Sequence, residues 1–160
     1  MKNVISRRTL IGNVAAASVL AGRLGEAAQQ SAGIRGFDHV ALPMQNTDEM
    51  LAFYRDLGLP VTASANAYSV YVGSQMINFH RPTHWQDKTF TLRAAAAKPP
   101  CGDLCFVWEG TPESLKAMLD LAGAKVVEGP VERQGSRKMV GSSTYVRDPD
   151  GNLLEFMIYP

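Results

Sequence analysis

Two stretches of the chain carry the same order of hydrophobic patterns. Each opens with a short apolar strand, over residues 37–42 in the first stretch and 103–108 in the second. Each strand leads into a helical pattern, in which apolar residues recur three and four positions apart. The run 46–48 offers an N-cap for the first helix, and Thr111–Pro112 is a strong start for the second. The pattern therefore predicts a strand followed by a helix, twice.

Glycines and short apolar runs continue the repeat. Gly58 and Gly123 follow the two helical patterns and are suited to C-caps, while Gly73 with Ser74 forms a hairpin turn. Three strands are expected after each helix: around Val61, over 68–72 and over 75–80 in the first stretch, and over 125–128, 142–146 and 153–159 in the second.

A strand–helix–three-strand unit has too few strands to bury both faces of its sheet alone. Two such units side by side curl into a half-barrel. We therefore predict an α+β fold over residues 34–160, in which paired βαβββ modules form a curved eight-stranded half-barrel. Residues 81–100 are expected to be a linker without chemistry of its own.

One carboxylate interrupts the last apolar strand. Glu155 follows the turn 148–151, whose Asp-Pro-Asp-Gly sequence favours chain reversal. A buried carboxylate needs a compensating partner, and a metal ion is one. The first strand supplies His39, the last strand of the first module ends at His80, and the second module opens with Asp103. Imidazole and carboxylate ligands suit Zn, Ni, Co, Mn or Fe(II).

Each of these residues also has an ordinary structural interpretation. His39 alone is more often a half-buried histidine than a ligand, Glu155 alone more often faces solvent, and Asp103 is suited to an Asx turn. The internal repeat makes the metal-ligand interpretation more favourable, because it aligns Glu155 with Asn78. His80 lies on the same face of its strand as Asn78. His84, in the linker, is not expected to bind metal.

The charge and the cysteine content limit the classes of binding partner and cross-link that the chain is expected to have. The formal net charge of +1 and the charged fraction of 19% give no support for nucleic-acid or membrane-surface binding. On one extended strand, the α-carbons of Cys101 and Cys105 would lie roughly 13 Å apart, too far for a disulfide.

The N-terminal residues have the composition of a signal peptide followed by a linker, over 1–33. Ser6–Ile11 resembles the twin-arginine export signal, although ordinary Sec signals also contain adjacent arginines. Cleavage after Ala21 or Ala27 would release a periplasmic or secreted protein without a membrane anchor, and an uncleaved anchor is the alternative.

Residues 34–160 resemble the vicinal oxygen chelate superfamily of glyoxalases, bleomycin- and fosfomycin-resistance proteins and extradiol dioxygenases. The matching segments are Phe37–Leu42, Phe53–Leu59, Gln75–His80 and Tyr145–Phe156. The resemblance implies that His39 and Glu155 are metal ligands. The first strand of the second module commonly carries His or Glu in this superfamily. Here it offers Asp103, and His80 is a substitute.

The resemblance implies a metal-dependent enzyme, of lyase, isomerase or dioxygenase type, that chelates a small oxygen-rich substrate, with Glu155 also as catalytic base. It also implies a homodimer. The alternative is a metal-free protein that sequesters a small molecule.

Overall fold

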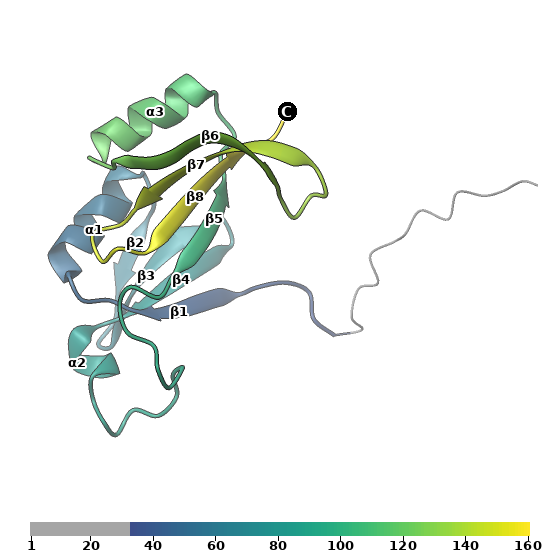
Figure 1. Ribbon diagram of the computed structural model, residues 1–160. Coiled ribbons are helices and arrows are strands. Elements are labelled where there is room, and N and C mark those ends of the chain that lie inside the picture. Colours follow the sequence, from purple (N-terminus) through teal and green to yellow (C-terminus); the bar gives the residue numbers. More distant parts are fainter. Residues whose placement is uncertain (1–32) are drawn as a thin grey trace, which may run out of the picture. The chain divides into compact units, whose positions relative to one another are not determined.

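The computed structural model describes residues 33–160, in which residues Gly36–Pro160 form one compact unit. It contains two four-stranded sheets, with strand orders β1-β4-β3-β2 and β5-β8-β7-β6 (Figure 1). The elements are β1 (His39–Pro43), α1 (Thr47–Asp56), β2 (Val61–Ala63), β3 (Ala67–Val72), β4 (Gln75–His80), α2 (Pro82–Trp85), β5 (Asp103–Val107), α3 (Pro112–Leu121), β6 (Val126–Gln134), β7 (Val140–Arg147) and β8 (Leu153–Ile158).

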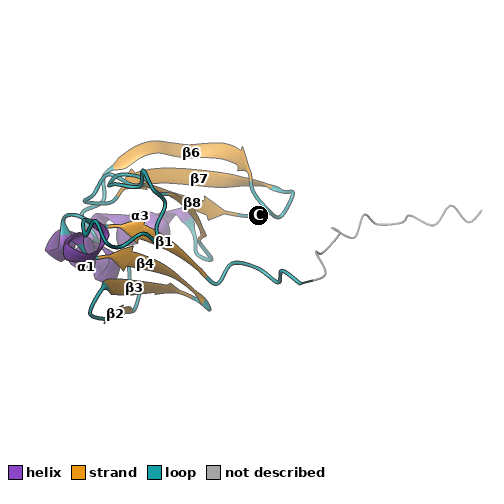
Figure 2. Cartoon of the chain, turned by 90° about the horizontal axis from the view of Figure 1, so that it is seen from below, coloured by secondary structure: helices purple, strands orange, loops and turns teal. Residues whose placement is uncertain are grey.

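The two sheets have the same topology. The first strand of each module pairs in parallel with the last, as β1 with β4 and β5 with β8, and the other pairings are antiparallel. Figure 2 shows the two sheets as separate, curved layers of strands with the helices gathered towards one side. This confirms the predicted α+β fold of paired βαβββ modules in a curved half-barrel.

The helix caps form largely as the sequence predicts. Gly58 (φ 80°) and Gly123 (φ 64°) take the left-handed conformation at the ends of α1 and α3. The Thr111 hydroxyl accepts a hydrogen bond from the Ser114 amide at 3.2 Å. Asn46 holds the N-cap position of α1, but its side chain makes no capping bond. It donates instead to the Pro149 carbonyl at 3.1 Å, across the module boundary.

The linker contains one element that the sequence did not reveal. Residues Pro82–Trp85 form the single turn of α2, with Pro82 at the start. Four residues are too few to display a helical period, so only the proline signals this turn. The Trp85 indole donates to the Met44 carbonyl at 2.8 Å and ties α2 to the end of β1.

One core runs through both modules. It gathers residues from α1 and α3 and from one face of each sheet; those that are fully or nearly fully buried include Met44, Met50, Tyr54, Val70, Phe79, Leu119, Val146 and Leu154. The two longer helices, α1 and α3, therefore cover one face of each sheet. The other face, which neither α1 nor α3 covers, is called the helix-free face below.

The turn before β8 joins the modules. Asp150 accepts hydrogen bonds from the backbone amides of Gln45 (2.7 Å) and Asn46 (2.8 Å) at the start of α1. Asp148, buried at 4% exposure, accepts a hydrogen bond from the Tyr54 hydroxyl at 3.0 Å. A Cβ at Gly102 would lie 2.9 Å from the Leu42 side chain, so the β1 and β5 edges approach closely. These contacts bring the two first strands side by side.

Candidate functional site on the helix-free face

The strand register places the predicted residues at equivalent points of the two modules. Asn78 is the partner of Ala41 in β1, and Glu155 is the partner of Cys105 in β5. Asn78 and Glu155 therefore occupy matching positions, as the sequence repeat predicts. His39 and Asp103 each occupy the first position of their strand and lie on the same face as these residues, because alternate strand residues share a face.

Glu155 lies at the centre of a group of polar side chains. It is half-buried and accepts a hydrogen bond from the buried Ser143 hydroxyl on β7 at 2.5 Å. Its register partners are Cys105 on one side and Tyr145 on the other. Donors on both neighbouring strands thus fix the orientation of the carboxylate.

The pKa of the Cys105 thiol reflects the surroundings of Glu155. Burial raises its pKa to about 11, and the charge of Glu155 and a hydrogen bond to that carboxylate add to the effect. The residue is nevertheless exposed to solvent. At neutral pH the thiol is therefore protonated and acts as a donor to Glu155.

The positively charged side chain of Arg133 extends this group of polar side chains towards β6. The Arg133 guanidinium donates to Glu128 at 2.9 Å and lies 5.7 Å from the ring centre of Tyr145. The pKa of Arg133 is raised, first by its hydrogen bond with Tyr145. Burial raises the pKa of Tyr145, and the hydrogen bond with Glu155 raises it further, while Arg133 acts in the opposite direction. Arg133, Tyr145 and Glu155 thus form one connected network across the sheet.

The two histidines predicted as ligands have different surroundings. His39 is exposed, and its Nδ1 lies 2.7 Å from the carboxylate of Asp38, which precedes it. His80 lies next to the linker, with its ring centre 5.3 Å from that of His84 and 5.4 Å from that of Phe90. Burial lowers the pKa of His80, and the neighbouring His84 and His39 lower it further, so the ring is neutral at neutral pH.

These positions allow a test of the predicted metal site. A resident metal ion normally has three or more protein ligands. Within residues 33–160, no group of three or more His, Cys, Asp or Glu side chains is arranged to hold a metal ion. His39, Asp103 and Glu155 share the helix-free face, but the side chains in this arrangement do not fit a three-ligand centre.

Sequence reasoning missed Cys105, Ser143 and Tyr145 as parts of this site. Cys105 and Ser143 had a usable signal, because alternation along β5 and β7 puts them on the face that carries Asp103 and Tyr145. Which β7 residue lies beside Glu155 depends on the β7–β8 register, which local sequence does not specify.

Comparison with known proteins identifies the family. The family model of the Glyoxalase/Bleomycin resistance protein/Dioxygenase superfamily matches residues 36–156. The chain belongs to this superfamily. The match spans both modules, which agrees with the resemblance seen in the sequence and with the topology of the two sheets.

Several relatives are known. The chain is 36% identical over 134 residues to glyoxalase domain-containing protein RDO1 of Mycosarcoma maydis, a match that covers 82% of this chain and 72% of that protein. It is 36% identical over 124 residues to virulence protein STM3117 of Salmonella typhimurium, covering 76% of this chain and 83% of the relative.

The crystal structure of STM3117 superposes with a TM-score of 0.70 at 32% identity, over 79% of this chain and 98% of that chain. An integron cassette protein from the mobile metagenome of V. cholerae gives a TM-score of 0.70 at 29% identity, over 79% and 97%.

Proposed function

We propose that this chain is an enzyme that acts on a small oxygen-rich molecule at the helix-free face, with Glu155 as its acid–base group. The observation that carries the proposal is the position of Glu155. It is a half-buried carboxylate in an otherwise apolar strand, oriented by the Ser143 hydroxyl and flanked by Cys105 and Tyr145. Burial of a carboxylate that serves only the fold is costly, whereas an oriented carboxylate suits proton transfer.

The neighbours of Glu155 have distinct tasks in this proposal. Glu155 takes a proton from a substrate carbon or hydroxyl next to a carbonyl, and returns it to the product as an acid. The Tyr145 hydroxyl, which Arg133 contacts, lies beside it as a donor for a substrate oxygen that gains negative charge. Proton transfer by a positioned side chain contributes roughly 10²- to 10⁴-fold to a rate.

Metal dependence is a separate part of the proposal. His39 and Glu155, with Asp103 beside them, are the residues that would hold Zn, Ni, Co, Mn or Fe(II), and such an ion would polarise two adjacent substrate oxygens. His80 is a weaker candidate because its ring packs against His84 and Phe90. Since the described side chains do not form a three-ligand group, the proton transfer by Glu155 is proposed without a metal.

Metal titration tests this part. The parent, His39→Ala, Glu155→Gln and His84→Ala are treated with chelator and titrated with Zn, Mn, Ni and Fe(II). Glu155→Gln keeps the shape of the side chain and removes its charge, so it should weaken binding at least tenfold, as should His39→Ala. His84→Ala, matched in residue type to His39→Ala, should leave the affinity unchanged. Equal affinities in all four proteins would end the metalloenzyme proposal.

A metal-free sequestering protein is the second candidate, favoured by the lack of a three-ligand group among the side chains that the structure describes. Turnover separates the two candidates. A screen with α-oxo thioester adducts, epoxide antibiotics and catechols should find a compound whose conversion falls at least a hundredfold in Glu155→Gln. The exposed Glu132→Gln serves as the control and should convert it normally. Tight binding of such a compound without conversion would favour sequestration.

A further inference from the structure

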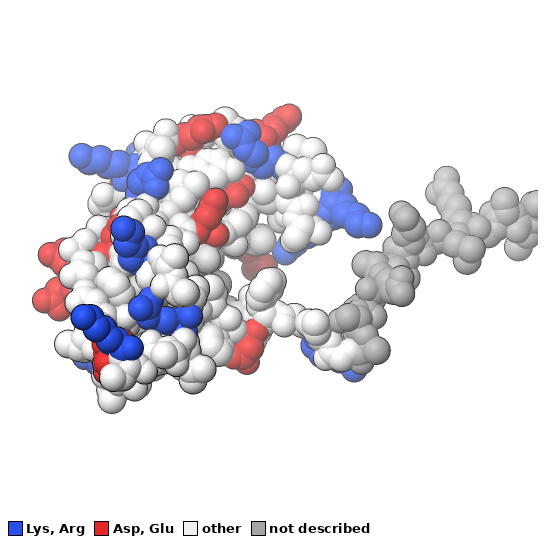
Figure 3. Space-filling model, turned by 60° about the horizontal axis from the view of Figure 1, so that its bottom comes forward, with Lys and Arg blue, Asp and Glu red and all other residues white. Residues whose placement is uncertain are grey.

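The linker between the two modules contains a small hollow whose charged side chains all have the same sign. This linker hollow has a volume of about 240 Å³ and is lined by Lys88, Phe90, Thr91, Arg93 and Ala95. Two of these residues are cations and none is an acid. Figure 1 shows the linker at the bottom of the unit, beside α2, and Figure 3, in which that side comes forward, shows several basic side chains on the near surface. A hollow lined by one sign of charge favours an occupant of the opposite sign.

Neither cation of the linker hollow is paired with a carboxylate. The ion pairs within residues 33–160 are formed by other side chains, so Lys88 and Arg93 belong to none of them. Asp87 precedes Lys88, but its carboxylate accepts hydrogen bonds from the Thr89 amide at 2.8 Å and from the Thr89 hydroxyl at 2.7 Å. The acid next to the hollow in sequence is therefore already engaged, and both positive charges are available to a ligand.

The Arg93 guanidinium has unused hydrogen-bonding capacity. Its Nη1 lies 3.5 Å from the Ala94 carbonyl oxygen and 3.3 Å from that of Ala95, both long for an N–H···O bond. Its Nε is buried and has no hydrogen-bond partner. The Nε of Arg81 is the other such side-chain atom within residues 33–160, but the Arg81 guanidinium lies over the Tyr68 ring at 4.0 Å. A buried donor without an acceptor is costly, and an oxyanion beside Arg93 would supply the acceptor.

Phe90 lines the linker hollow and also contacts the end of β4. Its ring centre lies 3.9 Å from that of His84 on α2 and 5.4 Å from that of His80, the last residue of β4. The half-buried ring is thus held in place by two neighbouring rings. It gives the hollow an apolar wall, so a molecule whose anionic group enters the hollow can pack an attached apolar group against Phe90.

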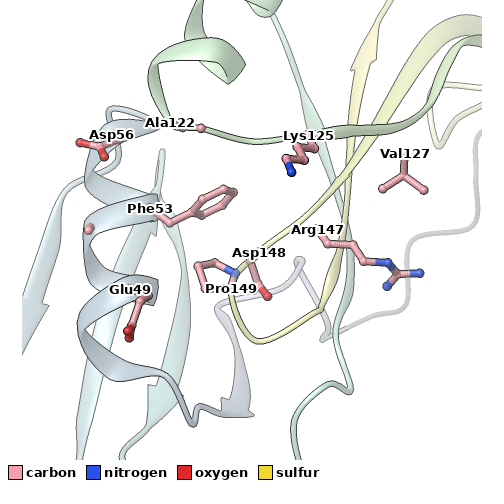
Figure 4. Close-up of a pocket in the computed structure, with 11 residues that line it drawn as sticks. Glu49, Phe53, Asp56, Ala122, Lys125, Val127, Arg147, Asp148 and Pro149 are labelled. Atoms are coloured by element: carbon pink, nitrogen blue, oxygen red, sulfur yellow. The ribbon is translucent and has the colours of Figure 1, made fainter.

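A larger hollow beside α1 has a different distribution of charge. Figure 4 shows Glu49 and Asp56 on the α1 side of this hollow, and Lys125 and Arg147 on the opposite side. Because acids and bases both line it, this hollow does not favour an anion over a cation. Lys125 is therefore a matched control for the cations of the linker hollow, since it is a basic residue that lines a hollow in mixed surroundings.

We propose that the linker hollow binds an oxyanion, the phosphate or carboxylate group of a small organic molecule. The Arg93 guanidinium donates hydrogen bonds to the oxyanion, because a planar fork of N–H groups matches the geometry of both phosphate and carboxylate. Lys88 adds a second positive charge, and the hydroxyl of Thr91 is a further donor. The organic part of the molecule packs against Phe90. Binding at this hollow requires no proton transfer by Glu155, so it can be tested without turnover.

Isothermal titration calorimetry of the full chain with inorganic phosphate, phenyl phosphate and benzoate tests the proposal. At low ionic strength, phenyl phosphate should bind with a Kd of about 1 mM or below. It should bind roughly threefold or more tightly than inorganic phosphate, because its ring packs against Phe90, and Phe90→Ala should remove this difference. Phenyl phosphate and benzoate carry the same ring, so the tighter of the two identifies the preferred oxyanion.

Replacement of the cations separates a defined site from general positive charge. Arg93→Lys keeps the charge and loses the planar fork, so it should weaken binding of the tighter probe about tenfold, and Arg93→Ala should weaken it further. Lys88→Ala, an exposed change that leaves packing intact, should also weaken it, whereas Lys125→Ala should not. Unchanged circular dichroism should confirm that every variant is folded. Absence of saturable binding to the parent, parental affinity in Arg93→Lys, or an equal loss in Lys125→Ala would overturn the proposal.

Discussion

At the scale of single residues, the helix-free face is organised around the pair Glu155 and Cys105. The two side chains are register partners on parallel strands. The carboxylate raises the pKa of the thiol, and the thiol donates a hydrogen bond to the carboxylate. The reactivity of the thiol is therefore a measure of the charge on Glu155, and it requires no knowledge of the substrate.

Removal of the Glu155 charge should make Cys105 more reactive. In a Cys101→Ser background, Glu155→Gln should lower the thiol pKa from about 11. Burial, the main cause of the raised value, remains, so the pKa should stay above that of a free thiol. Each fall of one pKa unit should raise the alkylation rate roughly three- to fourfold at mildly alkaline pH, because the larger thiolate fraction is offset by weaker nucleophilicity. Iodoacetamide kinetics measure this rate.

Asp103→Asn is the matched control for this experiment. Asp103 also raises the pKa of Cys105, but less than Glu155 does, so its replacement should accelerate alkylation by a smaller factor. An alkylation rate in Glu155→Gln equal to that of the parent would show that the contact between the two side chains is absent in solution.

At the scale of elements, the turn before β8 decides how the two modules meet. Asp148 accepts hydrogen bonds from Tyr54 on α1, from the amide of Asp150, and from the backbone and side chain of Asn152. The side-chain oxygen of Asn152 in turn accepts hydrogen bonds from the backbone amides of Cys101 and Gly102, which precede β5. The Asp-Pro-Asp-Gly segment is thus a chain reversal and also the joint between α1, β5 and β8.

Replacement of Asp148 should destabilise the fold. Asp148→Ala leaves several buried donors without an acceptor and should lower the free energy of unfolding by about 3 kcal/mol. Burial raises the pKa of Asp148, against the hydrogen bonds from Asn152 and Tyr54 that lower it. The folded state therefore holds this proton more tightly than the unfolded chain, whose aspartates titrate near ~3.9.

The sign of the pH dependence follows from this difference. The contribution of Asp148 is most favourable below ~3.9 and declines as pH rises through its raised folded-state pKa. Asp148→Asn resembles the protonated acid, so the unfolding free energy of the parent minus that of this variant should fall between roughly pH 3 and pH 7. Urea denaturation across this range measures it, and a difference that grows with pH would contradict the assignment.

Local sequence predicts the elements other than α2 and the equivalence of Asn78 and Glu155, because strand alternation and helix period are properties of short segments. It does not predict the neighbours of Glu155. The β6–β7 ladder contains register shifts between Val126 and Glu128 and between Glu128 and Val131. Such irregularities move Arg133 along the sheet relative to Tyr145. Gly129 and Pro130, which lie between Glu128 and Val131, are residue types that mark a bulge, but they do not specify the register on either side of it.

The position of His80 shows a similar limit. Parity correctly places it on the face of Asn78, but its environment depends on the linker, where α2 and Phe90 pack against the ring. The sequence therefore identifies a residue that faces the right way, and the long-range packing of the linker determines which partners it meets.

At the scale of the whole molecule, the internal repeat makes one domain from two incomplete halves. Each module leaves one face of its sheet uncovered by α1 and α3, and the close approach of Leu42 to Gly102 brings the first strands of the two modules together. This duplicated arrangement gives the helix-free face matching polar positions from both modules. No helix within the described residues is long and apolar enough to cross a membrane.

The candidate export signal lies within residues 1–33, and residues 1–32 are outside the part of the chain that the structure describes. Ser6–Ile11 places two arginines ahead of a short apolar run. If this is a twin-arginine signal, replacing both Arg7 and Arg8 with Lys should leave the precursor in the cytoplasm, although the charge is unchanged. Fractionation of expressing cells, with detection of precursor and mature protein, measures the effect. Arg23→Lys, the same chemical change outside this run, should not alter export. Undiminished mature protein outside the cytoplasm after the double replacement would instead assign the segment to the Sec route, which requires positive charge but not arginine itself.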